Sequence, residues 1–596
     1  MSDYQAPLKQ IRFTIEQLAD FSDVVALPDF TSVDGEMAGA VLEEAGRFAS
    51  GVLAPTNWLA DQQAVQVVDR AVRVPTEVAS AYTKFREGGW SSIGANPEFG
   101  GQGLPKTVAI ACDEMWAAAN VAFALCPELS QGAILALDRH ASEELKKLYL
   151  EKLISGQWTG TMCLTEPQAG SDLSTVASKA VPHGDRYLIS GRKIFITWGD
   201  HSMTENIVHL TLARLPDAPP GTKGISLFVV PKFKLNPDGT PGERNDVFPV
   251  SVEHKLGIHG SPTCVMAFGD AGGAEGFLVG KPNEGLAAMF TMMNYMRLGV
   301  GAQGVGLADR AYQKAVSFSR ERKQGRAPGA KGIVPIIRHP DIRRTLLLMR
   351  SLTQASRAIV YYTACCLDRG LHGVDAEAAA FWQTRGELMT PVAKAWTTEV
   401  GQEVTSLGMQ VHGGMGYIEE TGAAQFYRDA RILPIYEGTN GIHAIDLVVR
   451  KLPLGGGRGV VDLIGEIAAT AVALQSADDA RLQAVGARLE AGAAAAGSAA
   501  GWLTEHRDQS QADQLAGATP YLKLLGDVIG GWMLGKGALV AAARLAAGEG
   551  PEDFYRGKIA LARFYAEQTL ALAPGMAEAV VQGADVLAIT AEALGG

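Results

Sequence analysis

The chain has 596 residues, of which 47% are hydrophobic and 20% charged, and its formal net charge is −11. This length exceeds a single hydrophobic core, so we expect about three to four domains or layers, and the acidic balance disfavours non-specific binding to nucleic acid. Six scattered cysteines without a CxxC pair, no basic leader and no long apolar run predict a cytoplasmic protein without a metal site or integral membrane association.

The first 280 residues change from a helical to a β-rich texture. We expect an N-terminal extension over residues 1–40 and a helical domain over 41–160, where Val41–Leu53 has helical apolar spacing and Ser142 precedes acids as a helix cap. Residues 161–280 predict a β domain, because β-branched and aromatic runs alternate there with Gly, Pro and Asp turns. Its expected strands include Tyr187–Trp198, Ile207–Leu212 and Ile225–Val230.

Helical spacing returns after residue 280. Residues 281–452 predict a helical bundle, and the Gly-rich segment Leu454–Gly459 predicts a joint. Residues 460–596 predict an additional Ala-rich helical domain, with a kink or loop at Gly492–Gly501. The expected fold class is therefore mainly α with an inserted β domain, and this order of elements disfavours a wound parallel sheet. Long helices are expected around Arg297–Arg322, His339–Leu367 and Asp375–Leu407.

One glycine pattern imitates a dinucleotide fingerprint. Gly299, Gly301 and Gly304 spell GxGxxG, but the preceding segment looks helical, whereas the fingerprint requires a strand before it. We interpret these glycines as close helix packing or ligand approach. The chain also lacks GxSxG, HExxH and P-loop motifs, so hydrolase, zincin and nucleoside-triphosphatase functions have no support.

The most informative carboxylate is Glu437, which lies in the sequence YEGTN after the glycine-rich run QVHGGMGY at Gln410–Tyr417. Small residues expose backbone N–H groups to a phosphate, and Gly438 lets a flat ligand approach the backbone. A base beside an anion cradle suggests cofactor-dependent proton abstraction. A Glu-Gly pair taken alone, however, is more often a surface loop.

Two further motifs precede this array. LTEPQAGSD spans Leu164–Asp172 and KIFITWG spans Lys193–Gly199. The ordered set resembles the acyl-CoA dehydrogenase family, whose pattern is LTEP-x-AGSD, K-x-W/F-I-T-x-G and Q-x-x-GG-x-G…YEGT. The resemblance covers roughly residues 40–450, and the tail after 452 is similar to a longer bacterial branch that includes methylthiopropionyl-CoA dehydrogenases. It implies an N-terminal helical domain, a middle β-barrel domain and a C-terminal four-helix bundle, plus an extra helical domain.

The resemblance implies FAD as the cofactor. Candidate flavin-lining residues carried over from the family pattern are Met162, Leu164, Thr165, Ser171, Phe195 and Thr197. Candidates for the pyrophosphate and ADP part of an FAD from a neighbouring subunit are Arg322, Gln410, Gly413 and Gly414, with Thr439 as a further cofactor contact. The implied assembly is a homodimer or tetramer with the FAD site at the subunit interface.

Glu437 matches the position of the family's catalytic base. In the family this base removes the α-proton of an acyl-CoA thioester while hydride passes from the β-carbon to flavin N5, which gives a trans-2-enoyl-CoA. The alternative base position of some members is occupied here by Met296, which cannot act as a base. The segment after Arg322 lacks the usual Phe-Gly, and Asn294 replaces a common acid. Candidate substrate-binding residues are Ser171, Asn294, Arg297, Tyr436 and Gly438.

The resemblance further implies that electrons pass to an electron-transferring flavoprotein. An acyl-CoA oxidase that uses dioxygen is the nearest alternative, and a DNA-binding relative is disfavoured because residues 451–596 carry 11 Lys plus Arg against 16 Asp plus Glu. An inactive paralogue is disfavoured because Glu437 is present. The acyl group stays open: short, medium or 3-methylthiopropionyl chains are expected from the branch alone, since side chains deep in a pocket set the length.

Overall fold

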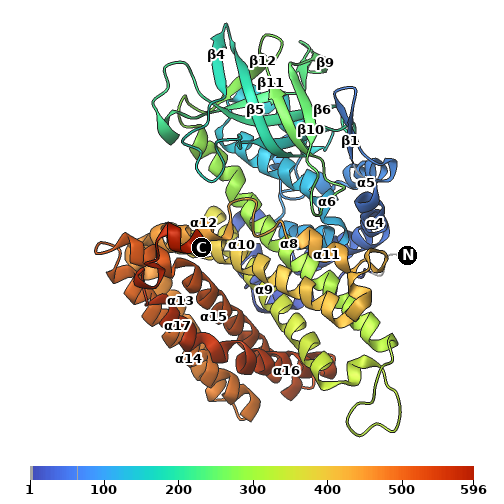
Figure 1. Ribbon diagram of the computed structural model, residues 1–596, viewed down its shortest axis with the longest axis vertical. Coiled ribbons are helices and arrows are strands. Elements are labelled where there is room, and N and C mark those ends of the chain that lie inside the picture. The colour runs from blue at the N-terminus through green and yellow to red at the C-terminus, as the bar shows by residue number, and fades with distance from the viewer. Residues whose placement is uncertain (1–3, 64, 596) are drawn as a thin grey trace. The chain divides into compact units, whose positions relative to one another are not determined.

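The computed structural model describes residues 4–63 and 65–595, which form two compact units (Figure 1). The sheet unit comprises residues 4–6 and 41–299, and the helical unit comprises residues 7–40 and 300–595. Helix α8 (Gly285–Glu321) contributes to both, because the division falls after Gly299. The N-terminal extension therefore belongs mostly with the C-terminal helices, and our finer five-part division of the chain stays a prediction.

The helices of the sheet unit surround α6 (Lys106–His140), which is buried over most of its length. This helix is kinked at Asn120, whose φ of −160° and ψ of 94° are not helical and whose side chain donates to Thr56 Oγ1 (2.8 Å). Helix α7 (Glu143–Ile154) begins where the sequence predicts, because Ser142 Oγ accepts the N–H of Leu145. The other elements here are α3 (Gly35–Phe48, from Val41 onward), the π-helix η2 (Ala49–Leu53), α4 (Ala54–Gln62), α5 (Thr76–Glu87), η3 (Trp90–Ser92) and η4 (Pro97–Phe99).

A short hairpin interrupts residues 41–160, for which the sequence predicted helices. Strands β1 (Gln66–Val68) and β2 (Ala71–Arg73) pair antiparallel. Asp69 and Arg70 between them have φ of 52° and 60°. Two left-handed central residues are typical of a type I′ hairpin turn, which usually carries Asn-Gly. Asp-Arg gives no such signal, and three-residue strands are too short for an alternating pattern.

The predicted β domain is an eight-stranded sheet with the order β10-β11-β5-β12-β7-β6-β3, and β4 pairs with β5 (Figure 1). All pairings are antiparallel except β3 with β6, in which Trp158 lies opposite Asn206 and Cys163 opposite Thr211. A separate hairpin joins β8 (Phe233–Leu235) and β9 (Pro241–Arg244). The sheet strands are β3 (Trp158–Cys163), β4 (Lys179–His183), β5 (Arg186–Thr197), β6 (Asn206–Ala213), β7 (Ser226–Pro231), β10 (Val247–Val252), β11 (Thr263–Phe268) and β12 (Ala274–Val279).

Both faces of β7 are buried, and its residues alternate between two hydrophobic clusters. Leu227 and Val229 pack with side chains of α6 and α7, whereas Phe228 and Val230 pack with Ile189 in a second cluster formed largely by the sheet. Burying each of these side chains contributes about 1.5–3 kcal/mol relative to leaving it exposed. Burial on both faces explains why the sequence shows continuous apolar runs there.

Long helices form the centre of the helical unit. α8 packs against α10 (Ala376–His412) so closely that a Cβ on Gly301 would lie 2.4 Å from the carbonyl oxygen of Ala393. A Cβ on Gly304 would lie 2.8 Å from that of Thr397. This confirms the helix-packing interpretation of these two glycines. The remaining elements are η6 (Ile336–Arg338), α9 (Pro340–His372), η7 (Gly413–Tyr417), η8 (Glu419–Thr421), α11 (Ala423–Ala430), α12 (Asn440–Asp446) and η9 (Leu447–Lys451).

The N-terminal extension packs onto this unit. Phe13 of α1 (Leu8–Gln17) meets Phe554 edge to face at 5.5 Å, and the buried ammonium of Lys558 lies 4.3 Å from its ring centre. Asp23 of α2 (Phe21–Val25) forms an ion pair with Arg369. Segments far apart in the sequence therefore share one core. A short turn, η1 (Pro28–Phe30), follows α2.

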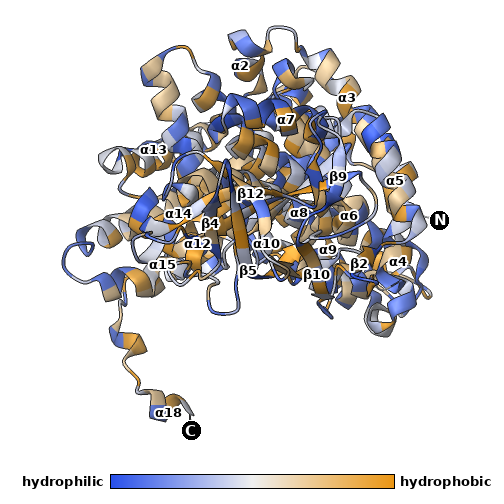
Figure 2. Ribbon diagram, turned by 90° about the horizontal axis from the view of Figure 1, so that it is seen from above, coloured by the Kyte–Doolittle hydropathy of each residue, from blue (hydrophilic) through white to orange (hydrophobic). Residues whose placement is uncertain are grey.

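The predicted joint and extra helical domain follow the bundle. Turn η10 (Leu454–Gly457) holds three consecutive glycines with positive φ, after which the helices lie side by side (Figure 1). The predicted kink at Gly492–Gly501 is wrong: these residues continue one helix, because small residues let it pack closely, with Gly492 beside Val528. The last short helix lies apart from its neighbours (Figure 2). The helices are α13 (Arg458–Gln475), α14 (Ala480–Glu505), α15 (Gln511–Ala546), α16 (Glu552–Gln568), α17 (Ala573–Val580) and α18 (Ala591–Gly595), with the turns η11 (Leu570–Leu572) and η12 (Asp585–Leu587).

Two helices of the described chain, α6 and α15, are long and apolar enough to cross a membrane by length and composition. Their most apolar stretches are 94% and 83% buried inside the protein. Core helices of a globular protein have the same character, and we assign both helices to the core.

Candidate active site

Strand β5 ends in a distorted segment that carries one of the predicted flavin contacts. Its register with β11 shifts between Cys264 and Met266, so β5 has an extra residue at Ile194–Phe195, which is a β-bulge. Phe195 adopts φ of 59° and the residue is 59% exposed. A left-handed conformation is costly for a residue with a Cβ, and an exposed ring gains little from burial. The bulge therefore presents an aromatic face outward at a cost in stability, as ligand-contacting positions often do.

The LTEP motif is fixed beside this strand by a buried ion pair. Lys193 Nζ lies 2.8 Å from Glu166 Oε1 and donates to the carbonyl of Leu164 (3.0 Å), and both charged side chains are almost fully buried. Burial by itself raises the pKa of Glu166, but the Lys193 ammonium and hydrogen bonds outweigh it and lower that pKa to about 2. The N–H of Ile194 donates to the carbonyl of Thr165 (2.9 Å). Two motifs almost thirty residues apart are thus brought side by side.

The two threonines predicted to contact the flavin edge both lie beside this contact. Thr165 and Thr197 are half-buried, and Thr197 lies opposite Thr263 in the ladder. Within the described part of the chain, neither hydroxyl forms a hydrogen bond to another residue, so both can serve a ligand. Leu164 is buried, Met162 half-buried and Ser171 exposed.

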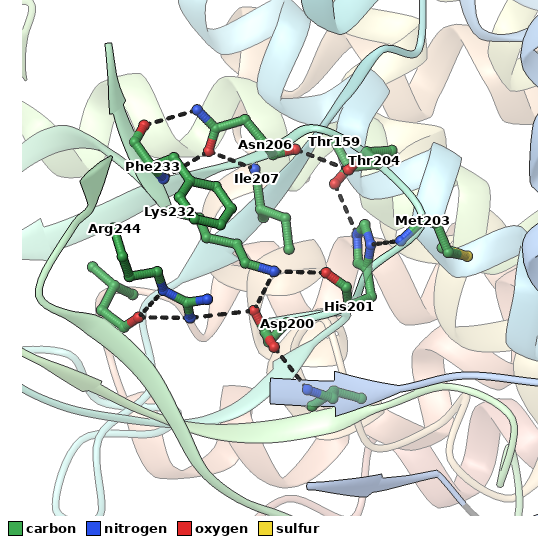
Figure 3. A network of polar contacts seen from close by, with 12 residues as sticks. Thr159, Asp200, His201, Met203, Thr204, Asn206, Ile207, Lys232, Phe233 and Arg244 are labelled. Carbon is green, nitrogen blue, oxygen red and sulfur yellow. Dashed lines mark hydrogen bonds and ion pairs between the residues drawn. The ribbon is translucent and has the colours of Figure 1, made fainter. Parts of the chain in front are cut away.

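The loop after β5 is held by a buried polar network that sequence reasoning missed (Figure 3). Asp200 Oδ1 pairs with Lys232 Nζ (2.7 Å) and lies 3.6 Å from Arg244 Nη2, while Oδ2 accepts the N–H of Val72 (2.8 Å). Lys232 Nζ also donates to the carbonyl of His201 (2.6 Å). These groups come from four distant segments, so no local motif indicates the network.

His201 in the same loop is a neutral structural histidine. The N–H of Met203 can only donate, so His201 Nδ1 accepts its hydrogen bond (3.2 Å) and Nε2 carries the ring proton. Nε2 therefore donates to Thr159 Oγ1 (2.9 Å; Figure 3). Burial holds the pKa of His201 well below its ordinary value, with a further contribution from the Lys232 charge. This side chain joins the loop to β3 through Thr159.

The predicted substrate contacts on α8 lie at the end of the sheet unit. Arg297 is buried and its Nη1 donates to Asn294 Oδ1 (3.2 Å), while Asn294 itself is exposed. Asn294 therefore offers Arg297 a neutral acceptor at a position where relatives commonly carry an acid. Met296 is buried, and a thioether has no proton-accepting group of useful basicity at this position.

In the helical unit, Glu437 lies in a strained turn between α11 and α12. Glu437 and Gly438 have φ of 55° and 87°, and the N–H of Asn440 closes the turn onto the carbonyl of Pro434 (3.0 Å). A Cβ on Gly438 would lie 3.1 Å from His443 Nε2. The glycine after the carboxylate is therefore needed for both its dihedral angle and its lack of a side chain. This confirms the expectation that Glu437 lies in a glycine-flanked turn.

Buried side chains that the sequence reasoning did not single out fix this turn. Lys394 Nζ donates to the carbonyl of Gly438 (2.8 Å) and to Asn440 Oδ1 (2.9 Å). His443 Nε2 lies 3.0 Å from the carbonyl of Glu437, and since a carbonyl only accepts, Nε2 carries the proton. Both peptide planes that follow the carboxylate are thereby held from inside the protein. A buried lysine within an apolar helix is a signal that could have pointed to this role.

Tyr436, a predicted substrate contact, faces the bundle through its hydroxyl. It donates a hydrogen bond to Oε1 of the buried Gln303 on α8. The backbone just before Glu437 is therefore also attached to the bundle. Thr439, a predicted cofactor contact, is exposed at the start of α12, where its carbonyl accepts from the N–H of Ile442 (2.9 Å).

The predicted phosphate-binding groups all face outward from the helical unit. Gln410, Gly413 and Gly414 are exposed at the end of α10, and a Cβ on either glycine would meet no atom within 4 Å. Arg322 is exposed at the end of α8, where its carbonyl accepts the N–H of Ile336 (2.8 Å). An open backbone and a guanidinium are groups that suit a diphosphate.

These features fit a flavin nucleotide. The sheet unit offers an outward aromatic face and two half-buried hydroxyls without partners in the described chain, and the helical unit offers open glycines and an arginine. Aromatic rings and hydroxyl donors are the usual protein contacts of a flavin ring system. Each unit by itself therefore carries groups suited to a different part of such a cofactor.

Four family descriptions match consecutive parts of the chain. They are the acyl-CoA dehydrogenase N-terminal domain (residues 36–157), middle domain (161–271) and C-terminal domain (283–452), and the acetyl-CoA dehydrogenase C-terminal like domain (463–590).

Relatives of known activity share most of their length with this chain. A 3-methylmercaptopropionyl-CoA dehydrogenase of Ruegeria pomeroyi is 47% identical, over 95% of this chain and 96% of the relative, and a butyryl-CoA dehydrogenase of Syntrophomonas wolfei is 33% identical, over 99% and 98%. An acyl-CoA dehydrogenase of Bacillus anthracis, solved as a complex with FAD, shares the fold with a TM-score of 0.74 at 20% identity, covering 95% of this chain and 91% of that one. The chain therefore belongs to the acyl-CoA dehydrogenase family, FAD-dependent oxidoreductases that act on acyl-CoA.

Proposed function

We propose that this protein dehydrogenates a short acyl-CoA thioester between its α- and β-carbons, with Glu437 as the base. The main support is the Glu437 turn, in which the glutamate has a left-handed backbone conformation. His443 binds the carbonyl of Glu437 and Lys394 binds that of Gly438. A strained residue over-determined by buried donors is typical of a catalytic position. The YEGT sequence and the family membership support the same assignment.

In this proposal the chain's residues position the substrate and move one proton. The Glu437 carboxylate takes the α-proton, and its N–H helps to hold the thioester carbonyl, where negative charge develops as the proton leaves. Bound FAD supplies the acceptor for the hydride that leaves the β-carbon. Phe195, Thr165 and Thr197 shield and orient the ring system, and Arg322, Gln410, Gly413 and Gly414 bind the diphosphate side.

The acyl group we propose is 3-methylthiopropionyl or another short chain. The support is the 47% identity to a 3-methylmercaptopropionyl-CoA dehydrogenase over almost the whole chain. A butyryl-CoA dehydrogenase relative also acts on a short chain. Arg297 and Asn294 are proposed contacts to the CoA part, with Ser171, Tyr436 and Gly438 lining the substrate.

We further propose a homodimer in the cytoplasm that passes electrons to an electron-transferring flavoprotein. Support for the dimer is an exposed apolar segment directly after the proposed diphosphate cradle: Met415, Tyr417 and Ile418 are 50%, 83% and 45% exposed. Large exposed apolar side chains in one segment are typical of an interaction surface. The residues proposed to bind the diphosphate lie next to this surface, as expected for a cofactor site that two subunits share.

The proposal is tested by mixing the FAD-loaded protein with a panel of acyl-CoA thioesters in the absence of oxygen and following the loss of visible flavin absorbance. The panel includes 3-methylthiopropionyl-, butyryl- and octanoyl-CoA, with wild type and Glu437→Gln compared. We expect the short thioesters to bleach the flavin, and we expect Glu437→Gln to slow bleaching by about 10²–10⁴-fold with FAD retained.

A different result would contradict each part of the proposal. Wild-type protein that cannot be loaded with FAD contradicts the cofactor sites, and bleaching that survives in Glu437→Gln contradicts the base. Reoxidation by dioxygen as fast as by an electron-transferring flavoprotein would favour the oxidase alternative.

A further inference from the structure

We propose that Asp200 is a positioning residue for the flavin site, acting through the end of β5. Asp200 lies three residues after Thr197. Its carboxylate joins this loop to the β1–β2 hairpin, to Lys232 directly after β7 and to Arg244 at the end of β9. This inference rests on the proposed function, because it concerns the residues assigned there to the flavin.

The contacts around Asp200 fix the loop from opposite sides (Figure 3). Lys232 bridges the Asp200 carboxylate and the His201 carbonyl, so one ammonium holds two successive residues of the loop. The hairpin contributes the N–H of Val72. A side chain that receives bonds from separate segments loses its rotational freedom, and so does the backbone that carries it.

The segment between Phe195 and Asp200 transmits this constraint over a short distance. The N–H of Trp198 donates to the carbonyl of Pro262 (2.7 Å), and its indole Nε1–H donates to the carbonyl of Ala122 beside the kink in α6 (3.0 Å). Trp198 also has φ of 53°, so Phe195 and Trp198 on either side of Thr197 are both left-handed. Such a backbone persists only where its surroundings over-determine it. Asp200 is the charged part of those surroundings.

The charge balance makes Asp200 difficult to replace. One buried carboxylate faces two cations, Lys232 and Arg244, and Arg244 also lies over the rings of Phe233 and Phe248. Removing the carboxylate leaves these cations near one another without their shared anion, which favours movement of the loop toward solvent. The hairpin is held on the same side by Arg70, whose guanidinium lies 3.6 Å from the centre of the Phe248 ring.

The test compares Asp200→Asn with Glu275→Gln as a matched control. Glu275 is a carboxylate of the same sheet that also has two cationic partners, Arg186 and Lys234, but it lies opposite Leu188 in the ladder, away from the end of β5. Asp200→Asn keeps the shape and an acceptor for the Val72 N–H, and it replaces the charged oxygen that faces Lys232 by an uncharged amide group. The readouts are the FAD dissociation constant, the visible spectrum of the bound flavin and the melting temperature.

We expect Asp200→Asn to weaken FAD binding by about tenfold, as for the loss of an outer hydrogen-bond partner of a ligating residue, and to shift the flavin band. Glu275→Gln should lower the melting temperature without either change. If Asp200→Asn yields no folded protein, Arg244→Gln at the more exposed edge of the network gives the same readouts, with a smaller expected loss of FAD affinity.

Unchanged FAD affinity and spectrum in the folded network variants would overturn the inference, and so would equal changes in Glu275→Gln. Failure of the proposed function is separable, because it would appear in the wild type as absence of FAD binding or of reduction by any acyl-CoA. If the wild-type protein binds FAD and the Asp200 variants bind it equally well, only the positioning role is refuted.

Discussion

The end of β5 in the sheet unit and the Glu437 turn in the helical unit each hold a large side chain in the left-handed region, but through different contacts. Phe195 has φ of 59° and Glu437 has φ of 55°. At β5 the constraint comes from a bulged ladder, a buried ion pair and a polar network that joins distant segments. At Glu437 it comes mainly from the buried donors Lys394 and His443, which bind two backbone carbonyls.

The difference predicts different consequences for substitution. Contacts around β5 also hold the sheet together, so losing them should reduce the free energy of unfolding. Contacts around Glu437 fix one turn on an already packed bundle, so losing them should reduce activity more than stability. Stability and activity measured on the same variants therefore test the comparison.

The largest effect on stability is expected for Lys193→Met. It removes one partner of a buried ion pair and leaves Glu166 charged and desolvated, which costs about 3–5 kcal/mol of unfolding free energy. Denaturant unfolding measures this loss. The matched control is Arg192→Gln, the neighbouring residue, whose exposed ion pair with Asp270 should contribute no more than about 1 kcal/mol. Similar losses in both variants would contradict a special role for the buried pair.

A smaller loss of stability and a clear loss of activity are expected for Lys394→Met. The carbonyl of Gly438 then lacks its charged donor, which costs about 1–3 kcal/mol, and the displaced carboxylate should lower kcat by about 10²-fold. Steady-state kinetics and thermal unfolding on the same sample separate the two. Lys451→Met, which breaks an ion pair with Glu387 in the same unit, should leave kcat unchanged. A normal kcat in Lys394→Met would show that this turn holds its shape by other contacts.

A gain in stability is expected for Phe195→Gly. Glycine adopts a positive φ without steric cost, so the variant should gain about 1 kcal/mol of unfolding free energy, while FAD binds more weakly because the aromatic face is gone. Chemical denaturation and FAD titration measure the two quantities. Ile196→Gly at the next, buried position should instead destabilise by about 2–5 kcal/mol. A destabilised Phe195→Gly would mean that the ring contributes to the core.

The remaining prediction concerns the dependence of stability on acid pH, which Glu166 controls. Lys193 and the hydrogen bonds hold its pKa at about 2 in the folded chain, below the ordinary value of 4.5. Its contribution to stability is therefore complete above pH 4.5 and is lost as the pH falls toward 2. Unfolding measured between these limits should show a steeper loss for wild type than for Glu166→Gln. Parallel curves would contradict the pKa shift.

Much of the fold follows from local patterns in the sequence. Ser142 capped a helix as expected, Tyr187–Thr197 formed most of a strand that was expected to extend to Trp198, and the glycine-rich joint at Leu454 formed a turn. The β1–β2 hairpin and the continuous α14 were not foreseen, because Asp-Arg is an unusual hairpin turn and because Gly492 serves helix packing. Small residues favour loops in isolation but permit close approach of helices in a packed core.

The amino-acid sequence by itself determined the family, the fold class and the chemical types present: a carboxylate before a glycine, threonines beside an aromatic residue, and glycines beside an arginine. The roles of these site residues stay predictions. Only the tertiary structure decided which distant groups hold them. Lys394 contacts a turn more than forty residues away, and Val72 meets Asp200 across different domains of the family. Such partners share no local period, because they are selected by the packing of whole elements and by the cost of leaving a buried charge or carbonyl unpaired.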